Sequence, residues 1–99
     1  MKRYEGRRES GIAHVSVNGV PLNPRLDLRK HSVTGFEWGY EGSGPAQLAL
    51  AILAEELQDD KLATERYHMF KRVIVAKLAY AEWSLTSDEI ERVLQAIPA

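Results

Sequence analysis

The fold is decided by the stretch from Pro45 to Leu57, which reads P-A-Q-L-A-L-A-I-L-A-E-E-L. Ser43 or Gly44 can cap a helix that begins here, and proline suits the first helical position because its missing N–H would have no partner there. The residues that follow are almost wholly apolar, and a helix that is apolar nearly all round has to be buried. We therefore expect a central buried helix over residues 45–57, with the rest of the chain packed around it.

The residues before this helix show the two-residue alternation of β-strands. Residues 12–17 alternate apolar and polar side chains and lead into Asn18-Gly19. This dipeptide is typical of a two-residue hairpin, because a type I′ turn needs a positive φ at both central positions. Pro21 confines the return strand over residues 20–22 to an edge of the sheet, or itself to an early position in the strand.

Further strand patterns are shorter. We predict a third strand with a basic outer face over residues 25–29, and residues 3–8 show a weaker strand pattern. Phe36, Trp38 and Tyr40 then stand at i, i+2 and i+4, which in an extended segment places all three rings on one face. We interpret this stripe as the contact between sheet and helices, and rings open for stacking as the alternative.

After the acidic pair Asp59-Asp60, apolar residues recur at helical spacing and predict a second helix over residues 61–82. Residues 83–85 are interpreted as a connector. Thr86 and Glu89 then form a T-x-x-E capping box that starts a short third helix over residues 87–96.

These patterns together predict an α+β fold, in which a small antiparallel sheet of three to four strands from residues 3–40 packs on three helices. The 99 residues, 44% hydrophobic and 27% charged, suit one domain spanning residues 1–99. The absence of cysteine excludes a disulfide scaffold, a thiolate metal site and a cysteine nucleophile. The charged N-terminus is no secretory signal, and the longest apolar run is far short of the roughly 20 residues of a membrane span. We expect a cytoplasmic protein without a membrane partner.

The net charge of -1 conceals an asymmetry between the two parts of the chain. Residues 1–40 carry seven basic and four acidic side chains, whereas residues 41–99 carry six basic and ten acidic ones. The first part can therefore present a local positive face, although a solvated surface with cancelling charges is the simpler interpretation. The near-neutral total disfavours nucleic acid as a partner.

The block from His31 to Leu50 is the most informative part of the sequence, because four of the seven glycines lie within ten of its residues. A glycine-rich segment that leads into a helix N-terminus can hold a phosphate or carboxylate on free backbone N–H groups. Side chains could add hydroxyl, amide, stacking and charged contacts. The predicted ligand-binding residues are Arg25, Arg29, His31, Trp38, Tyr40, Gly42, Ser43, Gly44 and Gln47, with Lys30 as a further source of charge.

Motif tests weaken this interpretation. The glycines follow neither the dinucleotide fingerprint nor a Walker A loop, and Ser43 is not in a nucleophile elbow. A tight strand-to-helix turn with a good cap would explain Gly42-Ser43-Gly44-Pro45 without a ligand.

The same block reads H-S-x-T-G-F-x-W-G-Y-x-G-S-G-P-A-Q-L-A-L and resembles the signature of a family of short phage and bacterial proteins classed as a domain of unknown function. The resemblance extends to Tyr4-Glu5-Gly6, to residues 24–28 and to Tyr67, Phe70 and Lys71. It implies one compact domain and a phage- or host-defence-related role, but no activity, substrate or catalytic residue.

Other chemistries do not assemble from the sequence. The three histidines are scattered without metal-ligand spacing, so we predict no metal site, no catalytic residue and no cofactor. We interpret Tyr67, Phe70 and Lys71 as two core residues and one solvated residue. The favoured hypothesis is a non-enzymatic protein that binds an unknown protein partner. The alternative is a nucleotide or other phosphate-containing small molecule at the glycine-rich helix start, and nucleic-acid binding is a weaker alternative.

Overall fold

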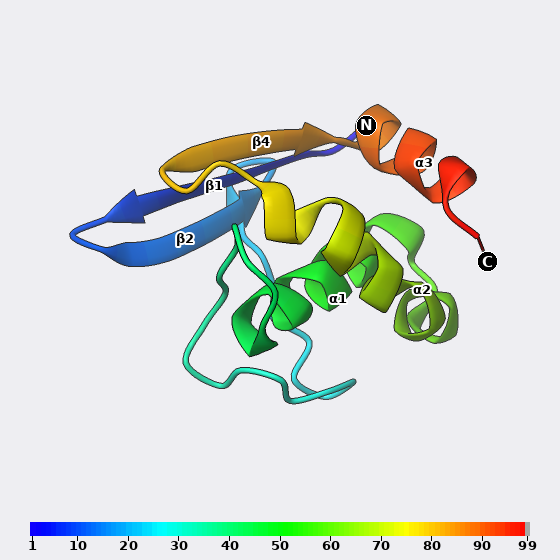
Figure 1. Ribbon diagram of the computed structural model, residues 1–99, viewed down its shortest axis with the longest axis horizontal. Coiled ribbons are helices and arrows are strands. Elements are labelled where there is room, and N and C mark those ends of the chain that lie inside the picture. Colours follow the sequence, from blue (N-terminus) through cyan, green and yellow to red (C-terminus); the bar gives the residue numbers. More distant parts are fainter. Residues whose placement is uncertain (99) are drawn as a thin grey trace.

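The computed structural model describes residues 1–98 and shows a four-stranded antiparallel sheet over three helices (Figure 1). The strands lie in the order β3-β2-β1-β4. Their bounds are β1 (Arg3–Glu9), β2 (Ile12–Val17), β3 (Val20–Pro21) and β4 (Glu82–Thr86). The helices are α1 (Ser43–Leu57), α2 (Asp60–Val73) and α3 (Ser87–Ala96), with a 3-10 turn, η1 (Val75–Lys77), after α2. The predicted α+β fold is confirmed.

The hairpin between β2 and β3 forms as the dipeptide predicts. Asn18 and Gly19 have φ angles of 50° and 83°, so both central positions of the turn are left-handed. The Asn18 side chain also accepts a hydrogen bond from the Arg3 N–H at 2.9 Å, which links this turn to the start of β1.

One face of the sheet packs on α1, the central helix, whose residues 44–54 are all buried. Tyr4, Val15, Trp83 and Leu85 point into this core. Trp83 lies directly over Gly6 of the neighbouring strand, where a Cβ atom would overlap the indole ring. Burial of these apolar side chains is the main favourable term in the stability of so small a protein.

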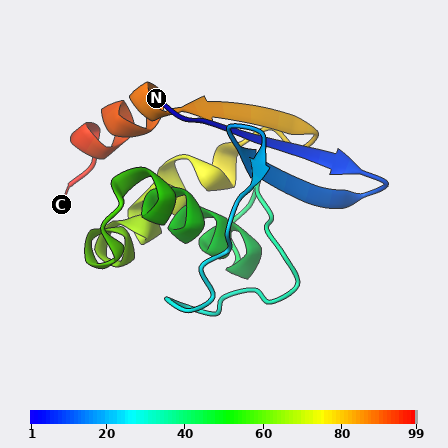
Figure 2. The same cartoon turned by 180° about the vertical axis from the view of Figure 1, so that it is seen from behind.

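The starts of α2 and α3 are capped as their sequences suggest, whereas α1 has Gly42 at its N-cap, not Ser43 or Gly44, and no side-chain hydrogen bond caps it. The Asp59 side chain accepts a hydrogen bond from the Leu62 N–H at the start of α2, and Thr86 and Glu89 form the predicted capping box of α3. At the end of α1, Lys2 Nζ donates 2.8 Å hydrogen bonds to the backbone carbonyl and the carboxylate of Glu55. The N-terminus thus lies beside the start of α3 and the end of α1, as seen from behind in Figure 2.

The predicted helix over residues 61–82 is too long. α2 ends at Val73, and the chain continues through η1 into β4, which includes the predicted connector 83–85. The run Val73-Ile74-Val75 is β-branched and disfavours helix. Trp83 and Leu85 are buried, whereas Glu82 and Ser84 are exposed. This period of two is that of a β-strand, and here it decides the structure over the helical spacing of the residues upstream.

Two predicted extended segments are also wrong. Residues 25–29 form a turn instead of a third strand, with Arg25 at φ 55° and a hydrogen bond from the Leu28 N–H to the Arg25 carbonyl. Residues 36–40 form no strand either, and the three rings do not share one environment: Trp38 is fully buried, whereas Tyr40 is 51% exposed. Strand β4, from after α2, and not the 25–29 or 36–40 segment, completes the sheet.

Candidate functional site

The long connection between β3 and α1 is organised by the side chain of Gln47. Gln47 is fully buried in the second turn of α1. Its Oε1 accepts hydrogen bonds from the His31 N–H at 2.8 Å and the Ser32 N–H at 3.1 Å. Its Nε2 donates to the carbonyls of Pro24 at 2.6 Å and Arg29 at 3.1 Å. Two donors and two acceptors are the full capacity of an amide, so Gln47 holds the loop and has no group left for a ligand.

The glycine-rich turn is packed against its own loop. A Cβ at Gly44 would lie 2.6 Å from the Glu37 Cβ, and a Cβ at Gly42 would lie 2.7 Å from the Tyr40 ring. Ser43 is exposed beside a hollow of about 350 Å³ that Glu37 and Tyr40 also line. The Arg8 guanidinium hydrogen-bonds Glu37 and holds the pKa of that carboxyl below its ordinary value. An ionised carboxylate in this hollow opposes an anion there.

The predicted stacking residues differ in exposure. Trp38 has no exposed surface, donates its indole N–H to the Tyr80 carbonyl at 2.9 Å and meets Trp83 edge-on, with ring centroids 5.6 Å apart. Arg8 lies over the Trp38 ring at 4.5 Å. Trp38 therefore has no free face for a ligand, and Tyr40 is the exposed ring of the pair.

Arg25 lies at the other end of α1 from the glycine-rich turn. Its guanidinium forms ion pairs with Asp27 at 3.1 Å and with Asp60, the first residue of α2, at 2.8 Å. With Ala54 and Gln58 it lines a small polar hollow near the C-terminus of α1. Its charge is neutralised there by two carboxylates.

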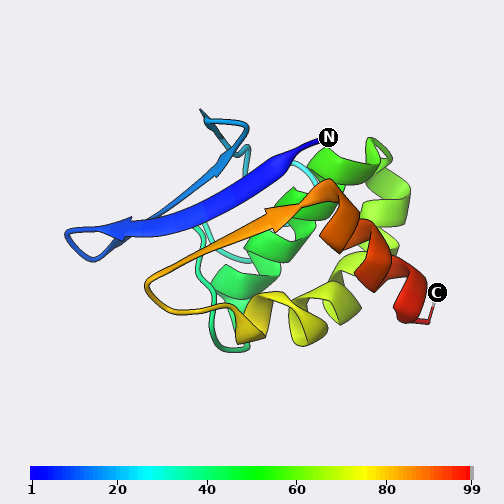
Figure 3. The ribbon, with the colours of Figure 1, turned by 90° about the horizontal axis from the view of Figure 1, so that it is seen from above.

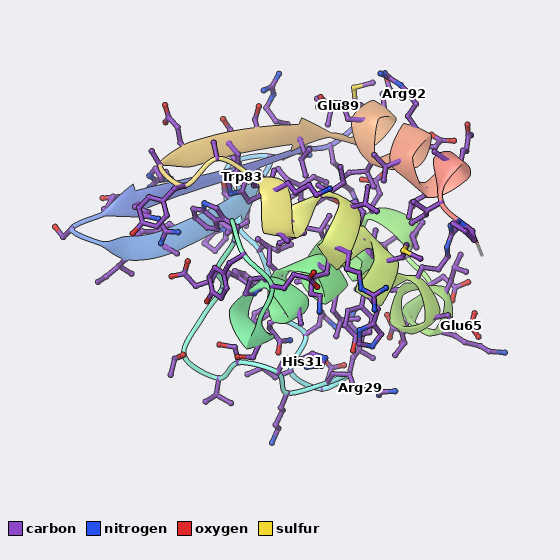
Figure 4. All side chains as sticks on the ribbon, in the orientation of Figure 1. Arg29, His31, Glu65, Trp83, Glu89 and Arg92 are labelled. Atoms are coloured by element: carbon purple, nitrogen blue, oxygen red, sulfur yellow. The ribbon has the colours of Figure 1, made fainter. Side chains whose placement is uncertain are left out.

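Of the predicted residues, His31 is the one that hydrogen-bonds Tyr67 of α2, and Arg29 lies two residues before it on the same loop. His31 Nε2 and the Tyr67 hydroxyl share a 2.6 Å hydrogen bond, with ring centroids 5.5 Å apart. His68 places its ring 4.1 Å from that of Tyr67 and 6.3 Å from that of His31. Figure 4 shows Arg29 and His31 on the same loop. We call Arg29, His31, Tyr67, His68 and Lys71 the His31 cluster.

Several side chains of the His31 cluster carry positive charge and repel one another. Burial lowers the pKa of His31, and the positive charges of His68, Lys71 and Arg29 lower it further. Burial raises the pKa of Tyr67, against the opposing effect of Arg29. Within residues 1–98, the one ion pair of the cluster joins Lys71 Nζ to Glu41 at 3.6 Å. Positive charge therefore exceeds negative charge here.

The sequence places Tyr67, His68 and Lys71 on one turn of a helix, but it does not show that the loop carrying His31 folds back onto them. We interpreted Tyr67 as core, and it is 2% exposed. Its hydroxyl nevertheless bonds His31. The detectable signal was the spacing of a tyrosine, a histidine and a lysine at i, i+1 and i+4, because i and i+4 share a helix face.

Over the described range 1–98, no three His, Cys, Asp or Glu side chains are grouped so that they could hold a metal ion. None of the helices in that range combines the length and apolarity needed to cross a membrane.

Comparison with known proteins gives a family match. A model described as a family of unknown function (DUF6166) matches residues 4–96. No curated protein and no solved structure matches the chain.

Proposed function

The chain belongs to this family of unknown function, and from that premise we propose that it is a non-enzymatic binding protein whose ligand presents a phosphate group to the His31 cluster. The observation that supports the proposal is the packing of His31 and His68 against the Tyr67 ring. Arg29 and Lys71 lie close enough for their charges to act on His31, and Glu41, paired with Lys71, is the carboxylate of the cluster. A phosphate would relieve the mutual repulsion of these groups and accept hydrogen bonds from them. A phage- or host-defence-related role rests on the sequence resemblance alone and stays a prediction.

The backbone beneath the cluster is held in place before any ligand arrives. Gln47 bonds the carbonyl of Arg29 and the N–H groups of His31 and Ser32, so the loop is tied to the buried helix. Tyr67 and Lys71 lie on α2, a regular helix. Binding groups that are already in position lose little conformational entropy when a ligand binds.

Phosphate binding at this site should be coupled to the protonation of His31. The groups that face it are Arg29 and Tyr67, His68 and Lys71 of α2, with Glu41 paired to Lys71. A bound phosphate would favour the charged imidazole, so addition of phosphate should raise the pKa of His31 from its lowered value.

The test is an NMR titration of the whole protein with inorganic phosphate and then with adenosine monophosphate, at constant ionic strength. We expect the largest shifts at His31 and His68, and weaker binding in Arg29→Gln and Lys71→Gln. Lys61→Gln, in the first turn of the same helix, is the matched control and should bind as the wild type does.

Three results would overturn the proposal. Phosphate shifts no larger than those caused by chloride would show that the cluster is only a solvated basic surface. Shifts confined to Gly42, Ser43 and Gly44 would favour the glycine-rich helix start instead. Tight binding of a single-stranded oligonucleotide, lost steeply with salt while free phosphate does not bind, would favour nucleic acid.

A further inference from the structure

Strand β4 leaves one edge of the sheet unpaired. It pairs with β1 on one side, and no further strand follows it in the sheet order. The hydrogen bond from the Ser87 N–H to the Lys2 carbonyl at 2.9 Å fixes which residues face β1. Because antiparallel pairing alternates, Leu85 and Trp83 turn their N–H and C=O groups towards β1. The backbone groups of Ser84 and Glu82 therefore point outward from the sheet.

The two edges of the sheet differ in how they are protected. The β3 edge is two residues long and contains Pro21, which cannot donate a hydrogen bond to a further strand. The β4 edge has five residues with neither proline nor lysine, the residues that commonly prevent edge pairing. At Thr86 the N–H is already bonded to the Glu89 carboxylate, but no hydrogen bond within residues 1–98 joins the outer groups of Ser84 or Glu82 to another segment.

An apolar groove lies beside this edge. It has a volume of about 400 Å³ and is bordered by β4, α3 and the C-terminal end of α2. Its apolar lining residues are Phe70, Ile74, Leu85, Ile90, Val93 and Ala96. Seen from above in Figure 3, β4 is nearer to α3 and to the C-terminal end of α2 than β1 is, and β1 is its neighbour within the sheet. A chain bonded to β4 would thus carry side chains on one face towards the groove.

The charges along the β4 edge and α3 indicate which partner fits. The groove lining itself carries one acidic and one basic side chain, Glu89 and Arg92. Outside the groove, Glu82, Asp88 and Glu91 are exposed on β4 and α3, and Arg7, which lies opposite Glu82 in β1, is already paired with Glu9. Figure 4 shows Glu89 and Arg92 at α3. A second copy that paired β4 with β4 would bring these carboxylates together, whereas a basic chain would complement them.

We propose that β4 and the adjacent groove bind an extended segment of a partner protein, which adds as a fifth strand, inserts apolar side chains into the groove and carries basic residues beside them. Main-chain hydrogen bonds to Ser84 and Glu82 hold the segment, and alternate side chains give selectivity. The inference is independent of the His31 cluster and goes beyond the proposed phosphate site.

The test uses the full chain and synthetic peptides that alternate lysine with valine, leucine or phenylalanine. Hydrogen exchange followed by NMR should show the Ser84 and Glu82 amides protected when peptide is added. A peptide of the same sequence with N-methyl groups on the bonding edge, and one with glutamate in place of lysine, should each bind roughly tenfold more weakly or worse, the loss expected from about one hydrogen bond or charge contact.

Two variants of the chain distinguish the contribution of the Ser84 backbone N–H from that of the Ser84 side chain. Ser84→Pro removes the outward N–H without removing a hydrogen bond to β1, and should weaken the peptide roughly tenfold. Ser84→Ala keeps the N–H and should bind as the wild type does. If Ser84→Pro fails to fold, the N-methylated peptides on the wild-type chain answer the same question.

Failure of every lysine peptide to protect Ser84 and Glu82 at millimolar concentration would overturn the proposal. Equal binding of the N-methylated and unmodified peptides would also overturn it, because strand addition requires the main-chain bonds. Protection of Ser84 that rises with protein concentration in the absence of peptide would assign the edge to a second copy instead.

Discussion

Replacing Gln47 with leucine should destabilise the protein more than any other single change of a polar side chain in the loop region. Leucine fills similar space in α1 but removes four hydrogen bonds, from the His31 and Ser32 N–H groups and to the Pro24 and Arg29 carbonyls. At a net contribution of roughly 1 kcal/mol for each bond, we expect a loss of about 3–5 kcal/mol. A domain of this size has a total stability of about 5–15 kcal/mol, so the variant should be close to unfolding at 37 °C.

Urea unfolding followed by tryptophan fluorescence measures this loss, since Trp38 and Trp83 are both buried in the native state. The matched control is Gln95→Leu, an exposed glutamine on α3, which should change the free energy of unfolding by less than about 0.5 kcal/mol. Hydrogen exchange at His31 and Ser32 should become fast in Gln47→Leu. A loss below about 1 kcal/mol, or unchanged exchange at these two amides, would refute the reasoning, because the loop would then not depend on Gln47.

Three other changes test separate parts of the structure. Gly44→Ala should cost about 1–3 kcal/mol in thermal unfolding because its Cβ would lie 2.6 Å from that of Glu37, and an unchanged Tm would contradict that contact. Arg66→Met should speed hydrogen exchange in α3, because Arg66 donates hydrogen bonds to the Leu94 and Ile97 carbonyls at 2.8 and 3.2 Å; unaltered exchange would show that α3 does not need them. The pKa of His31 should lie below its ordinary value, so the free energy of unfolding should decrease as the pH falls below about 6.5. NMR titration measures the pKa, and urea unfolding at several pH values should show that His31→Gln lacks this decrease.

The predicted elements that are correct depend on short-range patterns. The Asn18-Gly19 turn, the T-x-x-E capping box and the apolar helix after Pro45 each depend on residues a few positions apart. Backbone geometry and burial act directly on such neighbours, so sequence reasoning can identify them. The bounds of these elements lie within two residues of those predicted.

Strand β4 was missed because its partner is far away in the chain. Glu82–Thr86 alternate in burial, but they are only five residues long, and they follow a stretch whose helical spacing continues past the true end of α2. What makes them a strand is the pairing with β1, about eighty residues earlier, including Trp83 against Gly6. Tertiary pairing of this kind overrides local propensity, and one sequence contains no measure of it.

The glycines of the block that seemed to point to a ligand are accounted for by backbone and packing. Gly35 and Gly39 have φ angles of 131° and 87°, which side chains other than glycine rarely adopt. Gly42 and Gly44 lie where a Cβ would meet Tyr40 and Glu37. The density of glycines therefore follows from folding a long loop back onto α1, and it is no evidence for a phosphate cradle. What the block contributes to a binding site is His31 at its beginning, because Gln47 holds that residue against α2 and its positive side chains.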